Sequence, residues 1–287
     1  LALSKYGTLP LDVVLAPAIR YAAQGFELTQ RHVNAISRRR EKLSQFAESA
    51  RIYLPNGRVP TVGSLFRQPD LARTLKLIAT EGADIFYRGE IAQRMVAFME
   101  KHGGLITLQD LEIYEAKERQ AIHGVYRGYD IFSMPPPRSG GIHVVQILNI
   151  LEAYDLSQLE SNSTEFVHFL AEAMKLAFAD RAHFLGDSDF VAVPIEGLIS
   201  KSYAKKRQRL IQPNQAMVLE AHGNPIPVES HHTTHFSVLD RDGNAVSITQ
   251  TVNSGFGSGM VVERTGIILN NEMDDFSAQP GMPNVYG

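Results

Sequence analysis

The chain has 287 residues, of which 44% are hydrophobic and 21% are charged, proportions that are ordinary for a globular protein of one large domain or two small ones. Its formal net charge of −3 gives no electrostatic reason to expect a nucleic acid or a membrane as a partner. It contains no cysteine, which excludes a disulfide framework and thiol chemistry, and no apolar run that approaches the roughly 18 residues of a transmembrane helix.

The first part of the chain is predicted to be helical. Residues 10–24 carry apolar side chains at helical spacing and end at Gly25. The ranges 69–80 and 84–101 repeat this design, and each ends close to a glycine. Because each of these helices has an apolar side to bury, they are expected to form a core together.

More helices are predicted in the middle of the chain. Thr107 and Asp110 have the spacing of a helix N-cap and its acidic partner. The prolines at 135–137 are expected to be extended ahead of a helix over 142–151, and a long amphipathic helix is predicted over 164–184. The apolar side of this long helix would carry the following residues: Phe166, Leu170, Ala173, Met174 and Ala177.

The helical pattern weakens after residue 203. The three basic residues at 205–207 are interpreted as the solvated face of a helix. Residues 220–230 include two prolines, a glycine and several polar side chains, which is the composition of a linker.

A β-hairpin is predicted after this linker, with its turn at residues 240–244. A three-residue loop over 241–243 pairs Phe236 with Ile248 on a continuous apolar face, whereas a two-residue loop mixes apolar and polar side chains on both faces. The other face then carries these polar pairs: Ser237 with Ser247, His235 with Thr249, and Thr233 with Thr251, followed by Asn253. Half-buried strands often have a polar, solvated face, so this pattern alone favours the ordinary interpretation over a site.

A glycine-dense segment and a pair of acids follow the hairpin. Residues 253–259 contain three glycines, and a second apolar run follows at 266–269. Glu272 and Asp275, which come directly after that run, are three positions apart and could hold an ammonium group between them.

Several of these stretches together resemble one known family. The sequence Thr-Thr-His-Phe-Ser at 233–237, the glycine-dense segment, and Leu-Asn-Asn-Glu-Met-Asp-Asp-Phe-Ser at 269–277 are similar to the γ-glutamyltranspeptidases, which are N-terminal-nucleophile hydrolases. The similarity continues upstream through Tyr-Arg-Gly-Tyr at 126–129 and through residues 133–143, and it covers the whole chain. Several long motifs in the same order make the resemblance specific.

The resemblance implies an α+β fold, the αββα four-layer sandwich of these hydrolases, with a mostly helical first part and a C-terminal part rich in β-hairpins. It also implies self-cleavage between His232 and Thr233. Residues 1–232 would be the C-terminal portion of a large subunit and residues 233–287 the N-terminal portion of a small subunit, together one incomplete domain. The chain is therefore expected to be an internal fragment without the family's α-carboxylate-binding arginine, Ser-Ser pair and Gly-Gly oxyanion segment.

The family's site residues can be carried over to matching positions. Thr233 would be the catalytic nucleophile, and Thr251 would hydrogen-bond to it and orient it. Three residues would hold the α-amino and α-carboxylate groups of the glutamyl moiety: Asn253, Glu272 and Asp275. Tyr286 resembles the tyrosine of a lid loop that closes over the site by bonding to Asn253.

The implied activity is that of a self-processing γ-glutamyl hydrolase and transpeptidase. Such an enzyme cleaves glutathione and related compounds through a γ-glutamyl-threonine ester, and it transfers the γ-glutamyl group to water, an amino acid or a dipeptide. The two subunits would form a heterodimer, in the periplasm or outside the cell. No cofactor is expected, and no metal either, because the histidines lack the spacing of a zinc site: His231, His232 and His235.

Two alternatives remain open. One is a cephalosporin acylase-like hydrolase that acts on a glutaryl group, although a glutaryl group has no ammonium for Glu272 and Asp275 to bind. The other is a non-catalytic, unprocessed homologue that keeps the fold as a binding or structural module.

Overall fold

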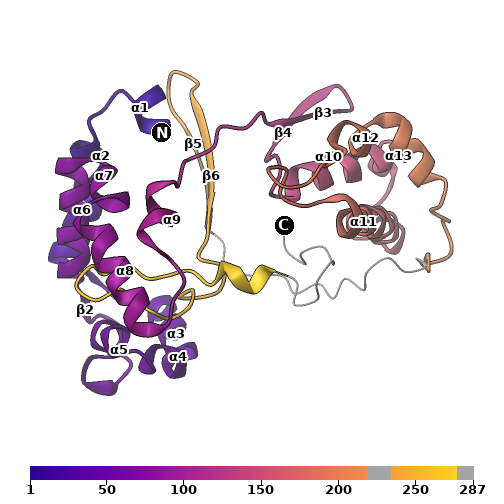
Figure 1. Ribbon diagram of the computed structural model, residues 1–287. Coiled ribbons are helices and arrows are strands. Elements are labelled where there is room, and N and C mark those ends of the chain that lie inside the picture. Colours follow the sequence, from indigo (N-terminus) through magenta and orange to yellow (C-terminus); the bar gives the residue numbers. More distant parts are fainter. Residues whose placement is uncertain (219–233, 277–287) are drawn as a thin grey trace. The chain divides into compact units, whose positions relative to one another are not determined.

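The computed structural model describes residues 1–218 and 234–276 (Figure 1). These residues belong to two compact units, the first made of Leu1–Lys117 and Glu229–Glu272, and the second of Glu118–Val228 and Met273–Gly287. This division describes how the residues pack. The predicted boundary between residues 232 and 233 is instead a site of covalent cleavage, and it stays a prediction. No helix in the described ranges is long and apolar enough to cross a membrane.

Short helices make up most of the first unit (Figure 1). They are α1 (Ala2–Tyr6), α2 (Leu11–Gln24), α3 (Gln30–Arg38), α4 (Arg40–Ser44), α5 (Ala47–Tyr53), η1 (Pro55–Gly57), α6 (Pro69–Glu81), α7 (Asp84–Tyr87), α8 (Glu90–His102) and α9 (Leu108–Glu112). Strands β1 (Phe26–Glu27) and β2 (Leu65–Phe66) pair antiparallel. The predicted ends of α2 and α6 are confirmed, because Gly25 and Gly82 follow them with φ of 87° and 80°, values that favour glycine.

The prediction of one continuous helix over residues 84–101 is wrong. α7 ends at Tyr87, and Gly89, with φ −99° and ψ −153°, is extended before α8 begins. A Cβ at Gly89 would lie 2.6 Å from the Ile85 side chain, so the turn requires a residue without one. Apolar spacing continues across this break, which is why the pattern did not reveal it. At α9 the predicted cap is confirmed, because Asp110 N–H donates to Thr107 Oγ1 at 3.2 Å.

The core of the first unit has two clusters, and one segment connects them. One cluster lies among α3, α4 and α5 and includes Leu43, and the other lies along α8 and includes Met95. Val261 is fully buried in the first cluster and Val262 in the second. Successive side chains of an extended chain point to opposite sides, so residues around 261 pass between the clusters. We call residues 253–271 the threaded segment.

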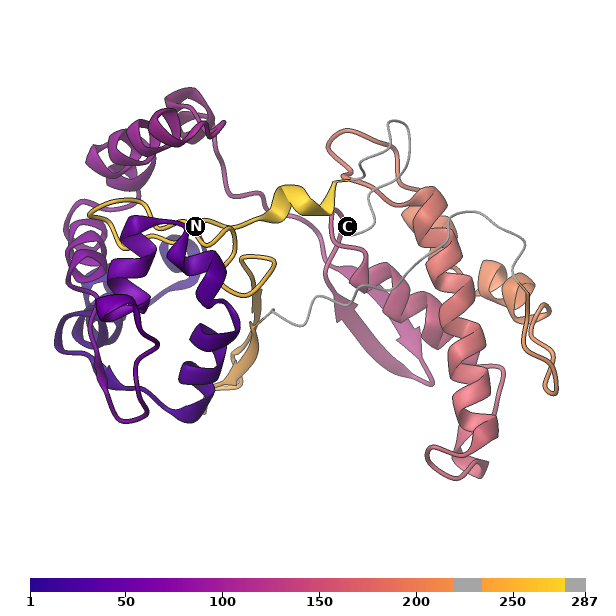
Figure 2. The ribbon, with the colours of Figure 1, turned by 90° about the horizontal axis from the view of Figure 1, so that it is seen from below.

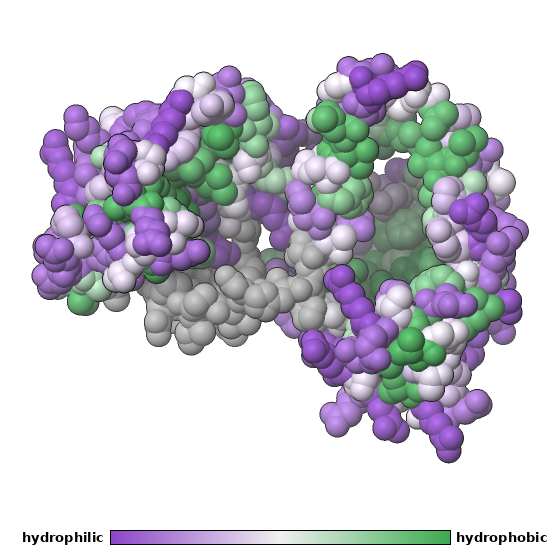
Figure 3. Space-filling model, turned by 180° about the vertical axis from the view of Figure 1, so that it is seen from behind, coloured by the Kyte–Doolittle hydropathy of each residue, from purple (hydrophilic) through white to green (hydrophobic). Residues whose placement is uncertain are grey.

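The hairpin that leads into the threaded segment has the predicted register. Strands β5 (Thr234–Leu239) and β6 (Ala245–Gln250) pair Phe236 with Ile248 and His235 with Thr249. The loop has Gly243 at φ 86°, as the three-residue loop requires. Both faces of the hairpin are exposed, and its apolar residues Phe236, Val238, Val246 and Ile248 are 39–54% accessible. In Figure 3, apolar side chains of this first unit also surround a hollow in its surface.

The second unit is built on one long helix (Figure 2). Its elements are β3 (Ile122–Tyr126), β4 (Tyr129–Ser133), α10 (Gly140–Leu151), η2 (Leu156–Gln158), α11 (Thr164–Phe184), α12 (Ile195–Leu198) and α13 (Lys201–Gln208). α10 packs against the β3–β4 hairpin on one side and against α11 and α13 on another. The predicted bounds of α11 are confirmed, and the Ser163 side chain caps it by accepting from Phe166 N–H.

The predicted apolar side of α11 is partly wrong. Ala173 and Ala177 are buried, but Met174 is 39% exposed. The buried side instead includes two acids, Glu172 and Asp180, each with a cationic partner. Paired charges can be buried, and hydropathy does not show which charges are paired.

The prediction that residues 205–207 form a solvated face is wrong for Arg207. Its guanidinium donates to Asp180 at 2.8 Å and to the Leu176 carbonyl at 3.1 Å. Gln146 of α10 also donates to the Asp180 carboxylate. Burial raises the pKa of Asp180, and Arg207 opposes this effect.

Candidate functional site

The described part of the candidate site is the end of β6, the threaded segment and a short helix after it. Three predicted site residues, His232, Thr233 and Tyr286, lie outside the described residues. The other four, Thr251, Asn253, Glu272 and Asp275, lie within them and can be placed.

A side-chain-capped turn ends the hairpin. Asn253 N–H donates to Thr251 Oγ1 at 2.9 Å, which is a turn that threonine hydroxyls commonly stabilise. Asn253 itself has φ of 69°, a conformation that asparagine tolerates better than most residues. The turn therefore holds the backbone of Asn253 next to the hydroxyl of Thr251.

Asparagine side chains join the two ends of the threaded segment. Asn253 Nδ2 donates to the Asn271 carbonyl at 3.0 Å. In the opposite direction, Asn271 Oδ1 accepts from both the backbone N–H and the hydroxyl of Ser254, each at 3.0 Å. Asn271 N–H also donates to the Val252 carbonyl. Residues 18 positions apart, Asn253 and Asn271, thus form one polar cluster directly before Glu272.

Glu272 and Asp275 are the first and last residues of one short 3₁₀ helix, η3 (Glu272–Asp275). Side chains three positions apart eclipse each other on such a helix, so both acids lie on the same side of it. Both are half-buried, and Glu272 N–H is bound to Asn270 Oδ1 at 2.9 Å. Two carboxylates on one side of a fixed turn have the chemistry to bind an ammonium group.

The residues that hold the threaded segment in place were not predicted from the sequence. Ser49 of α5 is fully buried, donates to the Gly259 carbonyl at 2.7 Å and accepts from Val261 N–H at 3.1 Å. Lys42 of α4 donates to the Gly257 carbonyl at 2.8 Å. Gly257 is packed so closely that a Cβ would lie 2.2 Å from the Leu269 carbonyl oxygen. The glycine spacing was a signal of close packing, but Ser49 and Lys42 have no local signal.

The polar face of the hairpin continues toward this site. His235 Nδ1 lies 2.7 Å from Thr249 Oγ1, and the Ser237 hydroxyl donates to that of Ser247 at 3.3 Å. The predicted row of hydroxyls with an imidazole is therefore confirmed for the pairs that the structure describes.

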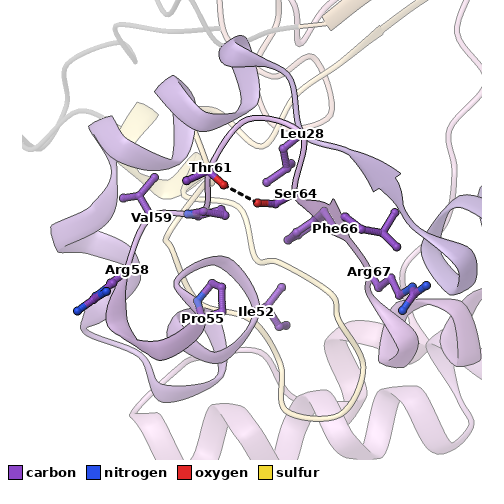
Figure 4. Close-up of a pocket in the computed structure, with 11 residues that line it drawn as sticks. Leu28, Ile52, Pro55, Arg58, Val59, Thr61, Ser64, Phe66 and Arg67 are labelled. Atoms are coloured by element: carbon purple, nitrogen blue, oxygen red, sulfur yellow. Dashed lines mark hydrogen bonds between the residues drawn. The ribbon is translucent and has the colours of Figure 1, made fainter.

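The polar cluster is separate from a cavity of about 450 Å³ in the first unit (Figure 4). Leu28, Ile52 and Phe66 give the cavity apolar walls, and the hydroxyls of Thr61 and Ser64 bond to each other at 2.9 Å on its lining. None of the four placed site residues lines it. Across residues 1–218 and 234–276, no group of three or more His, Asp or Glu side chains is placed to hold a metal ion.

Comparison with known proteins gives a consistent result. The profile of the family described as gamma-glutamyltranspeptidase matches residues 1–287. A protein of Escherichia coli (strain K12), described as a glutathione hydrolase proenzyme, is 47% identical over 290 residues, which cover 100% of this chain and 50% of that protein. The chain therefore spans about half the length of this curated relative.

Two solved structures are similar to this one. The γ-glutamyltranspeptidase of Helicobacter pylori has a TM-score of 0.74 and 43% identity, over 75% of this chain and 62% of that one. The cephalosporin acylase of Bacillus halodurans has a TM-score of 0.82 and 33% identity, over 98% of this chain and 51% of that one. These neighbours confirm the α+β class and the N-terminal-nucleophile hydrolase fold. Within the described residues, each sheet has two strands.

Proposed function

Because the chain belongs to the γ-glutamyltranspeptidase family, we propose that it is part of a self-processing γ-glutamyl hydrolase and transpeptidase whose nucleophile is Thr233. The large subunit would end at His232 and the small subunit would begin at Thr233. The relative from Escherichia coli is described as a proenzyme, which supports a cut of this kind.

The observation that carries this proposal is the register of β5 and β6. The described pairs run from Leu239 with Ala245 to Thr234 with Gln250. Continued by one position, this register would pair Thr233 with Thr251, and directly opposed residues in an antiparallel pair are close enough for hydroxyls to bond. The register thus supports Thr251 as the residue that orients the nucleophile, beside the polar cluster of Asn253.

In the first stage, the Thr233 hydroxyl attacks the carbonyl carbon of His232. The C–N bond to Thr233 breaks as the acyl group moves from nitrogen to oxygen, and the nitrogen takes a proton to become a free amine. Water then hydrolyses the ester, which leaves His232 with a carboxylate and Thr233 with an N-terminal α-amine. Such an amine has an unperturbed pKa of about 7.7–8.0, so near neutral pH it can accept the proton of its own hydroxyl.

In the second stage, the activated Thr233 oxygen attacks the γ-amide carbonyl of a γ-glutamyl compound such as glutathione. The amide bond breaks, the leaving amine takes the proton, and a γ-glutamyl ester of Thr233 remains. Water then releases glutamate, or the amine of an amino acid or dipeptide takes the γ-glutamyl group.

The acids of η3 support an amino-acid head group as the recognised part of the substrate. Asn253, Glu272 and Asp275 would hold the α-amino and α-carboxylate groups of the glutamyl moiety, with the two acids on the α-ammonium through charge-assisted hydrogen bonds. Tyr286 would close over the site by bonding to Asn253. The structure does not describe Tyr286, so this last role depends on the resemblance alone.

The similarity to a cephalosporin acylase supports a second candidate, a hydrolase that removes a glutaryl group. The two candidates differ in the ammonium, which glutaryl lacks. γ-Glutamyl-p-nitroanilide and glutaryl-p-nitroanilide therefore distinguish them. We expect the full-length protein to prefer the first by a factor of about 100 or more, because a site built to bind a polar group discriminates against an analogue that lacks it.

The remaining features of the proposal follow the family. The two subunits would stay together as a heterodimer, act without a cofactor, and be located in the periplasm or outside the cell.

The experiment is to follow the full-length protein and its Thr233→Ala variant at neutral pH by intact mass and N-terminal sequencing. We expect the wild-type protein to release a small subunit that begins Thr-Thr-His, and the variant to remain a single chain. The control is Thr234→Ala, which removes the neighbouring hydroxyl on the other face of the strand and should still be cut. An uncut wild-type chain would instead indicate the non-catalytic homologue.

A further inference from the structure

Asn271, the last residue of the threaded segment, has no role in the proposed function, although hydrogen bonds join it to three consecutive residues after β6. Its N–H donates to the Val252 carbonyl at 3.3 Å, and its carbonyl accepts from Asn253 Nδ2 at 3.0 Å. Its side-chain Oδ1 accepts from the N–H and the hydroxyl of Ser254, each at 3.0 Å. Asn271 therefore connects the end of the threaded segment to its beginning through both its backbone and its side chain.

The side chain of Asn271 helps to fix the position of its own backbone carbonyl. The two bonds from Ser254 hold the side-chain amide, and they keep the neighbouring carbonyl against residues 252–254. These residues are half-buried, where a hydrogen bond is stronger than in water and a lost partner is not fully replaced by solvent. A residue without a side-chain acceptor at position 271 would lose both bonds to Ser254 and hold the carbonyl less firmly.

That carbonyl sets the orientation of the Asn253 amide. A carbonyl oxygen only accepts hydrogen bonds, so the amide turns its Nδ2 toward Asn271 and its Oδ1 away. The backbone of Asn253 is held separately, because its N–H donates to Thr251 Oγ1. The orientation of this proposed substrate-binding amide therefore depends on Asn271.

Asn271 also helps to place one of the acids proposed to bind the ammonium group. Glu272 follows it directly in the chain, and Glu272 N–H is bound to Asn270 Oδ1 at 2.9 Å. The bond from Asn271 N–H to the Val252 carbonyl holds the backbone just before this acid. One residue thus positions a proposed head-group-binding side chain at each end of the threaded segment.

We propose that Asn271 is a positioning residue for substrate recognition, which holds Asn253 and Glu272 in the arrangement that binds the glutamyl head group. This inference rests on the proposed function. A site whose side chains are already ordered avoids the cost of ordering them when the substrate binds. The first cut involves His232 and Thr233 and no glutamyl head group, so Asn271 should affect the binding of substrate and not self-cleavage.

The test uses the full-length protein with Asn271→Ala, compared with Asn34→Ala, which makes the same substitution at an exposed asparagine of α3. We expect Asn271→Ala to raise KM for γ-glutamyl-p-nitroanilide about fivefold or more, the effect of losing two hydrogen bonds. Both kcat and the rate of self-cleavage should change by less than about twofold, because lost binding raises KM without slowing the reaction. Asn34→Ala should match the wild type in all three measurements.

A double-variant comparison shows whether Asn271 acts through Asn253. In the Asn253→Ala background, Asn271→Ala should lower kcat/KM by a smaller factor than in the wild type, because one of the two residues that it positions is already missing. Equal factors in the two backgrounds would overturn the inference, as would an unchanged KM in the folded Asn271→Ala protein. Losses of kcat and self-cleavage as large as the rise in KM would indicate a general structural role and would overturn it too.

Ser254→Ala covers the case in which Asn271→Ala does not fold. It removes the hydroxyl and keeps the N–H bond to Asn271 Oδ1, so KM should rise by a smaller factor, about threefold, with kcat and self-cleavage unchanged. A wild-type KM in this variant would then overturn the inference. A wild-type protein that is never cut, or that is cut and does not act on γ-glutamyl compounds, would instead refute the proposed function, so the two failures are distinguishable.

Discussion

The hairpin β5–β6 and the threaded segment are consecutive in the chain, but they are determined in different ways. The hairpin is exposed on both faces, and its register follows from its own turn and side-chain pattern. The threaded segment passes through the interior, where Ser49 and Lys42 bind its backbone across more than 200 positions of sequence. A site at their junction thus combines a locally specified strand with a loop whose shape depends on distant helices.

The largest expected difference between the two regions concerns their glycines. Gly257→Ala places a Cβ against the Leu269 carbonyl in a left-handed conformation, φ 52°. Overpacking and backbone strain together should lower the free energy of unfolding by about 3 kcal/mol. The matched variant is Gly243→Ala in the hairpin loop, where φ is 86° but no atom lies within 4 Å, and about 1 kcal/mol is expected.

Urea denaturation of the full-length protein measures both values. If Gly243→Ala lowered the free energy of unfolding as much as Gly257→Ala, close packing would not distinguish the threaded segment from the hairpin.

A smaller difference is expected between two serines. Ser49→Ala removes a buried donor to Gly259 and leaves Val261 N–H without its acceptor, so a loss of about 2 kcal/mol is expected. Ser237→Ala removes an exposed hydroxyl from the hairpin and should change stability by less than about 0.5 kcal/mol. Thermal unfolding of the two variants side by side tests this, and equal shifts in Tm would contradict it.

The smallest effect concerns pH and the hairpin loop. Hydrogen bonds from the Asn244 side chain and backbone, and from Asp242 N–H, lower the pKa of Asp240 below its usual 3.8. Since the folded pKa is the lower one, the carboxylate stabilises the loop at pH values above 3.8, and this stabilisation is lost as the pH falls through the folded pKa. NMR titration of the Asp240 carboxyl should give a midpoint below 3.8, and Asp240→Asn should remove the associated change in the loop amides. A midpoint at or above 3.8 would show that these bonds do not persist in solution.

The same contrast explains how much of the fold could be predicted. The ends of α2 and α6, the full length of α11 and the hairpin register depend on glycine, capping and alternation, which are local properties. The break at Gly89 was not predicted, because the apolar spacing of α7 continues into α8.

Which charged side chains are buried could also not be predicted from the sequence. Glu172 and Asp180 are polar in any hydropathy scale, and only the contacts of Glu172 with Lys175 and of Asp180 with Arg207 in the folded second unit make their burial favourable.

For the candidate site, the sequence predicted which residues matter better than how they are held. Thr251 and Asn253 come from the hairpin register and the family motif, and the structure brings them into one turn. Asn271 lies in the family motif at 269–277, but no role was predicted for it. Its hydrogen bonds to Ser254 could not be inferred, because they depend on how the two ends of the threaded segment meet in the folded protein.

The two adjacent valines of the threaded segment bear on what the proposed cut would do to the protein. Val261 and Val262 complete two separate apolar clusters whose other members include residues of α4 and α8, all upstream of position 232. Burying a valine contributes about 1.5–3 kcal/mol, so withdrawing both from the interior would be a partial unfolding rather than the separation of two surfaces. The proposed cut would then leave two fragments that depend on each other for folding, because neither would have a complete apolar interior of its own.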